Sequence, residues 1–278
     1  MDIKNKSLFI IFFTLFLHNI VYSIVIPYNG RYMNQNVVLK KSFINVYVYK
    51  NFAIYDESYI FFNKALFEIN GFIFCPCNKY PNTEQANVVA QVNNEVLSFA
   101  DKRIVSTVSK HPKNYEMCYV YPVTFDKEKQ VNVKLRYWVI LPRDKNKRMF
   151  SILKQPLNEW ASTVKYDAVQ LNFMEGITHD NITFTNVPYE TYDDNKQKVF
   201  WLNENHNPKK DLIVMFNVDD LQSNLLEDKD ENDDEEDNDT EDNKENNNSN
   251  DYIGEIDKIQ LLKNVDKAYA EIFPKEYY

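Results

Sequence analysis

Glycine is scarce in this chain of 278 residues, which contains only Gly30, Gly71, Gly176 and Gly254. A loop that cradles phosphate needs several glycines close together, because its backbone must approach the ligand without a Cβ in the way. The four glycines lie far apart along the chain. Their spacing therefore argues against a nucleotide-binding loop of that kind.

Cysteine is equally sparse, with Cys75, Cys77 and Cys118 only. The Cys-Pro-Cys stretch lacks the two-residue spacing of a zinc knuckle or a thioredoxin-type site, and no second pair completes four ligands. Three cysteines are also too few for a disulfide framework. We therefore predict no metal site and no disulfide scaffold.

Motifs of the common enzyme classes are missing as well: there is no Gly-x-Ser-x-Gly elbow, no His-Glu-x-x-His and no P-loop. His111, His179 and His206 lie far apart in predicted turns. His179 and Asp180 could form an acid–base pair, but no nucleophile is evident for them to serve. We predict no catalytic, cofactor-binding or metal-binding residue, and a protein that is not an enzyme. The basic stretch from Pro142 predicts a solvated turn, with an anionic headgroup or an acidic partner as the alternative.

Negative charge is concentrated in one tract, Glu227 to Asp251, which has fourteen acidic residues and two lysines. The whole chain carries a formal charge of -9, so the remainder carries about +3. A run of this kind repels itself and cannot bury enough apolar surface to offset the entropy of ordering, so we predict a disordered acidic insertion at 227–251. The nearly neutral remainder gives no indication of a nucleic-acid partner.

The N-terminus has the features of an export signal. Lys4 and Lys6 precede an apolar run, and small Ser23 follows it, which predicts a signal peptide at residues 1–23. The alternative is a signal anchor from Leu8 to Ile26, since that length could nearly span a bilayer.

The next segment, residues 24–80, has no acidic residue before Asp56 but contains lysine, arginine, asparagine and many aromatic residues. A basic, acid-poor stretch behind a signal peptide predicts a plastid transit-like segment that is disordered or removed. The alternative is ordinary mature chain, because Phe43 to Tyr55 alternates as a strand does.

A long helix is predicted to open the ordered part, with Asn82 or Thr83 as its cap. Its apolar residues recur every four positions, at Val88, Val92, Val96, Ala100 and Ile104. Predicted strands and helices follow in two similar series. The first has predicted strands at "YVYPVTF", "RYWVI", "RMFSIL" and "YDAVQLNF", with a helix from about Pro156 to Val164. The second has predicted strands at "NITFTNV", "KVFWLN", "DLIVMFN" and "IDKIQLL", with a helix at "DLQSNLL" and a terminal helix at "NVDKAYAEIF" capped by Asn264. The last strand of each series follows the pattern x-Asp-x-aliphatic-Gln-Leu.

These series predict an internal duplication. Its anchor pairs are 63 to 66 residues apart for the first three and 90 apart for the last, a difference close to the length of the acidic tract: Pro122 with Pro188, Trp138 with Trp201, Leu157 with Leu221, and Asp167 with Asp257. We therefore expect an α+β fold of two pseudo-symmetric β-β-β-α-β-α halves preceded by a long N-terminal helix. The leading helix and first half would occupy 81–180 and the second half 181–278. The alternative is that short strands with the same alternation look alike.

In order and outline, these segments resemble the Tic twenty-two family, a soluble intermembrane-space subunit of the plastid protein translocon. The resemblance is carried by "YPVTF", "FSILKQPLNEW", "NVPYETY", "VFWLN", "IVMFNVDDLQSNL" and "KIQLLKNVDKAYAEI". Abundant Asn, Lys, Ile and Tyr, together with an acidic, Asn-rich tract, are typical of malaria-like parasites. The resemblance therefore implies the type found in the apicoplast.

The resemblance implies a non-enzymatic, chaperone-like import factor that handles preproteins crossing the membranes of the apicoplast. Its expected partners are unfolded preproteins and translocon subunits, with peripheral association with plastid membranes. Its expected location is the intermembrane space or those membranes, and its preprotein-binding residues are unknown. The alternative is a secreted parasite surface or adhesion protein without catalytic activity, which would use the signal peptide alone.

Overall fold

The computed structural model describes residues 26–28, 35–77, 88–97, 101–104, 117–141, 143–152, 154, 157, 160–191, 195–218 and 255–273. The chain divides into two units, residues 1–218 and 219–278. Each unit is considered by itself below. The predicted signal peptide at 1–23, the predicted helix "DLQSNLL" and the acidic insertion at 227–251 lie outside the described residues.

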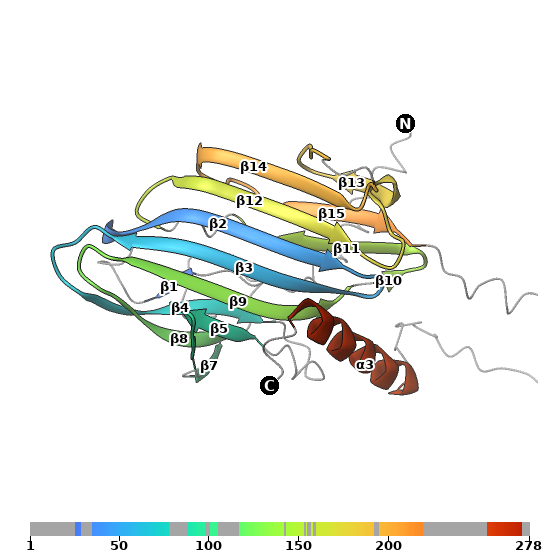
Figure 1. The fold of residues 1–278 in the computed structure, drawn as a ribbon, viewed down its shortest axis with the longest axis horizontal. Helices are drawn as coiled ribbons and strands as arrows, with labels where there is room; N and C mark the ends of the chain where they lie inside the picture. Colours follow the sequence, from blue (N-terminus) through green and yellow to red (C-terminus); the bar gives the residue numbers. More distant parts are fainter. Residues whose placement is uncertain are drawn as a thin grey trace, which may run out of the picture. The chain divides into compact units, whose positions relative to one another are not determined.

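The first unit is built of β-strands arranged in three sheets (Figure 1). The large sheet has seven strands in the order β14-β12-β2-β3-β9-β5-β6: β14 (Lys198–His206), β12 (Val164–Phe173), β2 (Val37–Val48), β3 (Phe52–Asn63), β9 (Gln130–Ile140), β5 (Val89–Val92) and β6 (Glu95–Leu97). Neighbouring strands are antiparallel except β2 and β12, which run parallel.

Two four-stranded sheets complete this unit. The first small sheet contains β1 (Ile26–Tyr28), β4 (Ile69–Cys77), β8 (Met117–Phe125) and β7 (Asp101–Ile104). The second small sheet contains β10 (Arg143–Asp144), β11 (Lys147–Ile152), β15 (Leu212–Asn217) and β13 (Ile182–Thr185), and the short 3-10 helix η4 (His179–Asn181) directly precedes β13.

Both small sheets cover the same face of the large sheet, which we call the inner face. On β3, Tyr59 and Phe61 pack with the first small sheet, whereas Ala53 and Tyr55 pack with the second. These four residues are separated by even numbers of positions, so their side chains point to one side of the strand. Two apolar cores therefore lie end to end beneath the inner face.

A β-bulge keeps β2 in register with both cores. Leu39 pairs with Phe61, but the next pair is Lys41 with Ile60, so β2 has one extra residue. The buried positions change from odd numbers before the bulge to even numbers after it, from Leu39 to Ile44. Such a bulge lets the same face of one long strand serve two cores.

Several predicted strands are present: β8, β9, β11, β12, β13, β14 and β15 lie where alternating apolar residues placed them. The predicted fold class is wrong, however, because the first unit is made mainly of strands and the expected leading helix is not formed. The described residues between 88 and 104 form β5, β6 and β7. Val92 pairs with Glu95 across a two-residue turn.

The physical reason lies in that turn. Asn93 and Asn94 both have positive φ, at 50° and 72°, which is the backbone of a tight hairpin that asparagine tolerates well. Val88 and Val92 point to the same side and pack against one core, because a spacing of four is also a multiple of the strand period of two. Val96 follows the turn and pairs with Gln91, so it lies on the opposite side and is 66% exposed.

The predicted duplication is also wrong. Asp167 lies on strand β12, whereas its partner Asp257 lies in α3 (Glu255–Ile272), an α-helix in the second unit. The predicted helix at 156–164 is reduced among its described residues to a 3-10 turn at Leu157, since Trp160–Ser162 form bends and Val164 begins β12. The predicted terminal helix is present as the last part of α3. However, α3 begins at Glu255, so Asn264 is not its cap and the predicted strand "IDKIQLL" is helical instead.

The segment at 24–80 is not a disordered leader over its described residues, because it supplies β1 to β4. Strands β2 and β3 lie in the middle of the large sheet, and Leu39, Ile44 and Tyr59 on them are fully buried. Removal of this segment would take two central strands out of both cores. The alternative reading of 24–80 as ordinary mature chain agrees with the fold.

Candidate functional site

A fully buried carboxylate occupies the centre of the inner face. Glu57 points inward from β3 and is 0% exposed. The Tyr59 hydroxyl donates a hydrogen bond to Glu57 Oε2 at 2.8 Å, and the Tyr137 hydroxyl donates to Oε1 at 2.7 Å. Tyr137 comes from the adjacent strand β9 and stacks on Tyr55 with 4.7 Å between ring centroids. The two hydroxyls therefore fix the carboxyl group between the two apolar cores.

A buried ion pair lies close to this carboxyl group. Lys154 Nζ is 2.5 Å from Asp167 Oδ1, and the side chains are 7% and 1% exposed. Lys154 follows β11 of the second small sheet, and its backbone N–H donates to Asp211 Oδ1 at 2.8 Å. Asp167 points inward from β12, so the pair connects the second small sheet to the large one. We call Glu57, Tyr59, Tyr137, Lys154 and Asp167 the inner polar cluster.

Charge in this cluster is not balanced when both carboxyl groups are ionised, because Lys154 is its only cation. Burial raises the pKa of Glu57 to about 8. The hydrogen bonds from Tyr137 and Tyr59 and the charge of Lys154 lower this pKa, and Asp56 raises it further. Glu57 is therefore mostly protonated near neutral pH, which leaves Lys154 and Asp167 as a compensated pair. Burial also raises the pKa of Tyr137, and the neighbouring Glu57 adds to that effect.

His206 and Ser42 lie at the border of the inner polar cluster. His206 Nε2 is 3.8 Å from Asp167 Oδ2, and among the described residues its Nδ1 atom is buried without a hydrogen-bond partner. Ser42 lies between Asp167 and Tyr59 in the sheet register, and its buried Oγ is likewise unpaired within that part of the chain.

The opposite, outer face of the large sheet has a different character. Asp56, the neighbour of Glu57 on β3, accepts a hydrogen bond from Arg136 Nε at 2.8 Å in a partly exposed ion pair. Leu202 and Phe43 are exposed and lie in one cross-strand row, in which Ala168 pairs with both. This row forms an apolar strip that crosses three strands.

The outer edge of β14 borders that strip. Phe200 directs its N–H and C=O away from β12 and exchanges two hydrogen bonds with Glu190, at 2.9 and 2.8 Å. Since strand backbone groups alternate in direction, Leu202 and Glu204 direct theirs to the same edge. On the edge of β14 that faces away from β12, the bridge between Phe200 and Glu190 is the one strand contact within the described ranges. Leu202 itself is 54% exposed.

The structure places the residues singled out in the sequence as follows. His179 Nδ1 is 3.3 Å from Asp180 Oδ1, and Asp180 also pairs with Lys196 at 2.8 Å. His111 lies outside the described residues. His206, which the sequence left without a partner, approaches Asp167. These contacts leave His179 and His206 in separate environments.

The predicted basic turn from Pro142 contains one side chain, Arg148, that points into the protein. Arg148 is 1% exposed and donates hydrogen bonds to the carbonyl oxygens of Lys50, Lys145 and Lys147, at 2.8, 2.9 and 3.0 Å. Its guanidinium thereby connects the β10–β11 turn to the β2–β3 turn. Reading the stretch as a solvated patch missed this role, because the long-range carbonyl partner is not visible in the sequence.

The cysteines lie on β4 and β8 of the first small sheet. Within the residues that can be described, no three His, Cys, Asp or Glu side chains gather in a way that could hold a metal ion. Every helix in the same part of the chain is too short or too polar to span a bilayer.

Comparisons with known proteins address the fold. No family model matches the chain, and no curated protein matches it. Among solved structures, a putative nutrient binding protein from Legionella pneumophila is 13% identical, with a TM-score of 0.56 over 71% of this chain and 72% of that one. An M1 zinc metallopeptidase from Deinococcus radiodurans is 8% identical, with a TM-score of 0.36 over 68% of this chain, which spans 43% of the peptidase. The Legionella protein shares the fold with this chain.

Proposed function

We propose that this chain is a polypeptide-binding protein that holds extended segments of other chains at the outer edge of β14. In this role it acts in a chaperone-like way, as an import factor for preproteins does. The observation that carries the proposal is the edge itself, where Leu202 and Glu204 direct backbone groups outward. Beside it lies the apolar strip, in which Leu202 and Phe43 are exposed on either side of buried Ala168.

Strand addition suits a partner without a fixed sequence. An extended segment that pairs with β14 gains main-chain hydrogen bonds, which every residue except proline can make. Its alternate side chains fall on the outer face, where an apolar residue can contact Leu202. A factor that holds many different preproteins needs this combination of sequence-independent pairing and a modest apolar contact.

The edge is accessible at one end and closed at the other. Glu190 covers β14 at Phe200, so an added strand pairs from Leu202 toward His206. That length is only a few residues, which favours weak, reversible binding. Reversible binding is what a factor that passes chains onward requires.

Suppression of aggregation tests the proposal. The full chain, in several-fold excess, is mixed with a denatured model protein, and light scattering is followed; binding of a labelled, permanently unfolded protein is measured by fluorescence anisotropy. Leu202→Pro removes one outward N–H without breaking the β12 ladder, because that N–H does not face β12. We expect this variant to bind about tenfold more weakly or worse. Leu202→Thr is the matched control, since it keeps the N–H and a good strand former.

Two outcomes would overturn the proposal. One is a wild-type chain that neither suppresses aggregation nor binds the unfolded protein. The other is a Leu202→Pro variant that folds, as judged by its thermal unfolding, and binds as strongly as wild type.

The plastid location stays a prediction. Because the segment predicted to be a leader contributes strands to the fold, the location must be tested with the full chain. Residues 37–77 belong to the folded unit, so a reporter is better placed after Tyr278 of the full chain than after residue 80. Delivery of the tagged chain to the plastid supports an import factor. Release to the cell exterior supports the alternative of a secreted surface or adhesion protein.

A further inference from the structure

The loop that joins β3 to β4 exposes two adjacent large apolar side chains. Leu66 is 71% exposed and Phe67 is 51% exposed. The loop lies at the end of the long strands, at the left of Figure 1, where β3 turns into β4. Neither core includes these two residues.

This loop is held in one conformation by Asn63, which is fully buried. Asn63 Nδ2 donates to the carbonyl oxygens of Phe67 and Phe125, each at 2.9 Å, and Asn63 Oδ1 accepts from the backbone N–H of Ala65 at 2.9 Å. The backbone N–H of Lys64 donates to the Asn36 carbonyl at 3.0 Å. Because the loop is already ordered, little conformational entropy is lost when Leu66 and Phe67 become covered.

Lysines surround the loop at this end of the sheet. The β8–β9 turn lies against it, since the Asn63 backbone N–H donates to the Lys129 carbonyl at 3.1 Å. The loop, this turn, the bulge of β2 and the start of β12 together carry six lysines and three carboxylates, a net charge of +3: Lys40, Lys41, Lys64, Lys127, Lys129 and Lys165, with Glu68, Asp126 and Glu128. One of the lysines, Lys129, is paired with Asp126 at 2.9 Å.

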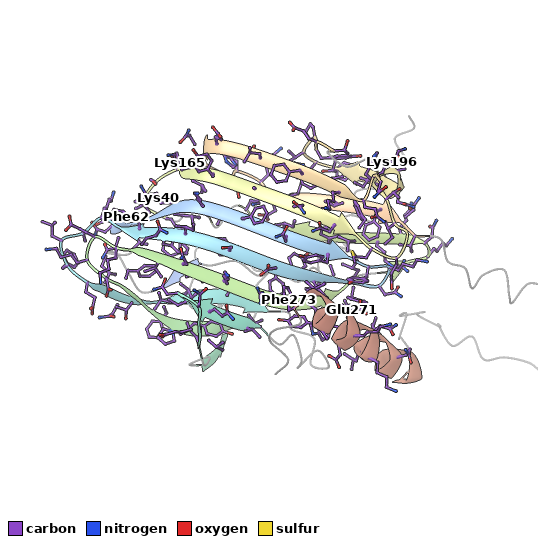
Figure 2. All side chains as sticks on the ribbon, viewed as in Figure 1. Lys40, Phe62, Lys165, Lys196, Glu271 and Phe273 are labelled. Atoms are coloured by element: carbon purple, nitrogen blue, oxygen red, sulfur yellow. The ribbon has the colours of Figure 1, made fainter. Side chains whose placement is uncertain are left out.

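Aromatic rings support several of these lysines. Lys40 Nζ lies 5.2 Å from the centroid of the Phe62 ring, and Lys41 and Lys165 lie 5.6 and 5.2 Å from that of Tyr166. Figure 2 shows Lys40, Phe62 and Lys165 near the same end of the long strands as the loop. The rings hold the ammonium groups at the surface, where an anionic partner can reach them.

We propose that the loop Lys64–Glu68 docks this protein on an anionic lipid bilayer, with Leu66 and Phe67 inserted among the headgroups and the lysines against acidic lipids. Two projecting side chains are too small an area for a stable protein interface, which buries about 800 Å² per partner. A bilayer accepts such a projection without a matching surface. The net positive charge complements the negative surface of an acidic leaflet.

Vesicle co-sedimentation of the full chain tests this proposal. We expect binding to vesicles of phosphatidylcholine with about one third phosphatidylserine, and much weaker binding to phosphatidylcholine alone. The double variant Leu66→Ser with Phe67→Ser should bind about tenfold more weakly to the mixed vesicles. Val96→Ser is the matched control, because Val96 is 66% exposed on β6 and lies outside the lysine-rich end. The double variant should keep its secondary structure and its hold on unfolded protein.

A charge variant separates the two contributions. Lys64→Glu with Lys127→Glu should weaken binding to the mixed vesicles and leave the weak binding to phosphatidylcholine unchanged. Added salt should act on wild type in the same direction, since surface charges are screened. The proposal is overturned if wild type does not bind the mixed vesicles at low salt. It is also overturned if the folded Leu66→Ser, Phe67→Ser variant binds them as wild type does, which would show that vesicle binding does not use the loop.

Discussion

Asp56 and Glu57 are neighbouring acidic residues on β3, and the sheet gives them opposite environments. Asp56 faces outward, where it forms a partly exposed ion pair with Arg136. Glu57 faces inward, where two tyrosine hydroxyls hold it and burial raises its pKa to about 8. The period of two along a strand is enough to separate them.

The same division applies to the sheet as a whole. Its inner face is covered by the two small sheets and contains the buried inner polar cluster. This face is therefore suited to holding the fold together. Its outer face has an apolar strip, exposed edge groups and lysines on aromatic rings, which makes it suited to partners. Variants of the inner face should therefore change stability, and variants of the outer face should change binding.

Breaking the inner ion pair should give the largest change. Asp167→Asn leaves Lys154 buried without a counter-charge, and we expect a loss of about 3–5 kcal/mol in the free energy of unfolding. Urea unfolding of the full chain measures it. The double variant Lys154→Met with Asp167→Leu removes both charges and should recover much of the loss. A double variant as unstable as Asp167→Asn would contradict an electrostatic cause.

The pH dependence of stability should be the next largest effect. The folded pKa of Glu57, about 8, lies above its ordinary value of 4.5, so the folded state binds this proton more tightly. The stabilisation is complete below about pH 4.5 and is lost as the pH rises toward and through 8. Between pH 5 and pH 8 the loss is about 3–4 kcal/mol.

Urea midpoints across this pH range measure the effect, with Glu57→Gln as the comparison. Glutamine keeps an uncharged group of the same size between Tyr59 and Tyr137, and cannot ionise near Lys154 and Asp56. Its stability should therefore vary much less between pH 5 and 8. Asp56→Asn on the outer face is the comparison, and it should keep most of the wild-type slope, because Asp56 is the weakest of the influences on the pKa of Glu57.

The sequence predicts those strands in which apolar and polar residues alternate clearly, and it fails where the same spacing also fits a helix. Alternation located β8, β9 and β11 to β15 because each has enough consecutive apolar positions on one face. It failed between 88 and 97, where valines at every fourth position suit both a helix and a strand. The pair Asn93–Asn94 was the deciding signal, since both residues adopt the positive φ of a tight hairpin turn.

The pattern x-Asp-x-aliphatic-Gln-Leu shows the same limit. From Tyr166 it forms strand β12, between two neighbouring strands, and from Ile256 it lies in helix α3, where buried Leu261, Val265 and Ala268 recur at helical spacing. Six residues do not determine their own structure; the flanking periodicity does. The repeat inferred from this pattern therefore had no structural basis.

The inner polar cluster was not predictable from the sequence. Glu57 lies in the segment predicted to be a leader, and the sequence marks Asp167 only as a repeat anchor. Lys154 and Asp167 are thirteen positions apart, one after β11 of the second small sheet and one on β12 of the large sheet, so their contact depends on how the two sheets pack. Likewise, nothing local to His206 indicates that it approaches Asp167.

The outer ion pair should contribute less than the inner one. Asp56→Asn removes a partly exposed pair with Arg136, and we expect a loss of about 1 kcal/mol or less. Because the pair is reached by solvent, the difference between wild type and variant should shrink as salt is added. Chemical unfolding at low and high salt measures this. A loss as large as that of Asp167→Asn would erase the distinction between the faces.

The smallest change in stability should come from the apolar strip. Leu202 is more than half exposed, so Leu202→Thr removes little buried surface and places a β-branched residue in a strand. We expect a change within about 0.5 kcal/mol, measured by thermal unfolding. The same variant should weaken the binding of unfolded protein by a few fold, less than Leu202→Pro does, because main-chain pairing is preserved and only the side-chain contact is reduced. A loss of stability without a loss of binding would show that Leu202 belongs to the fold, and the division between a structural inner face and a binding outer face would then fail at its edge.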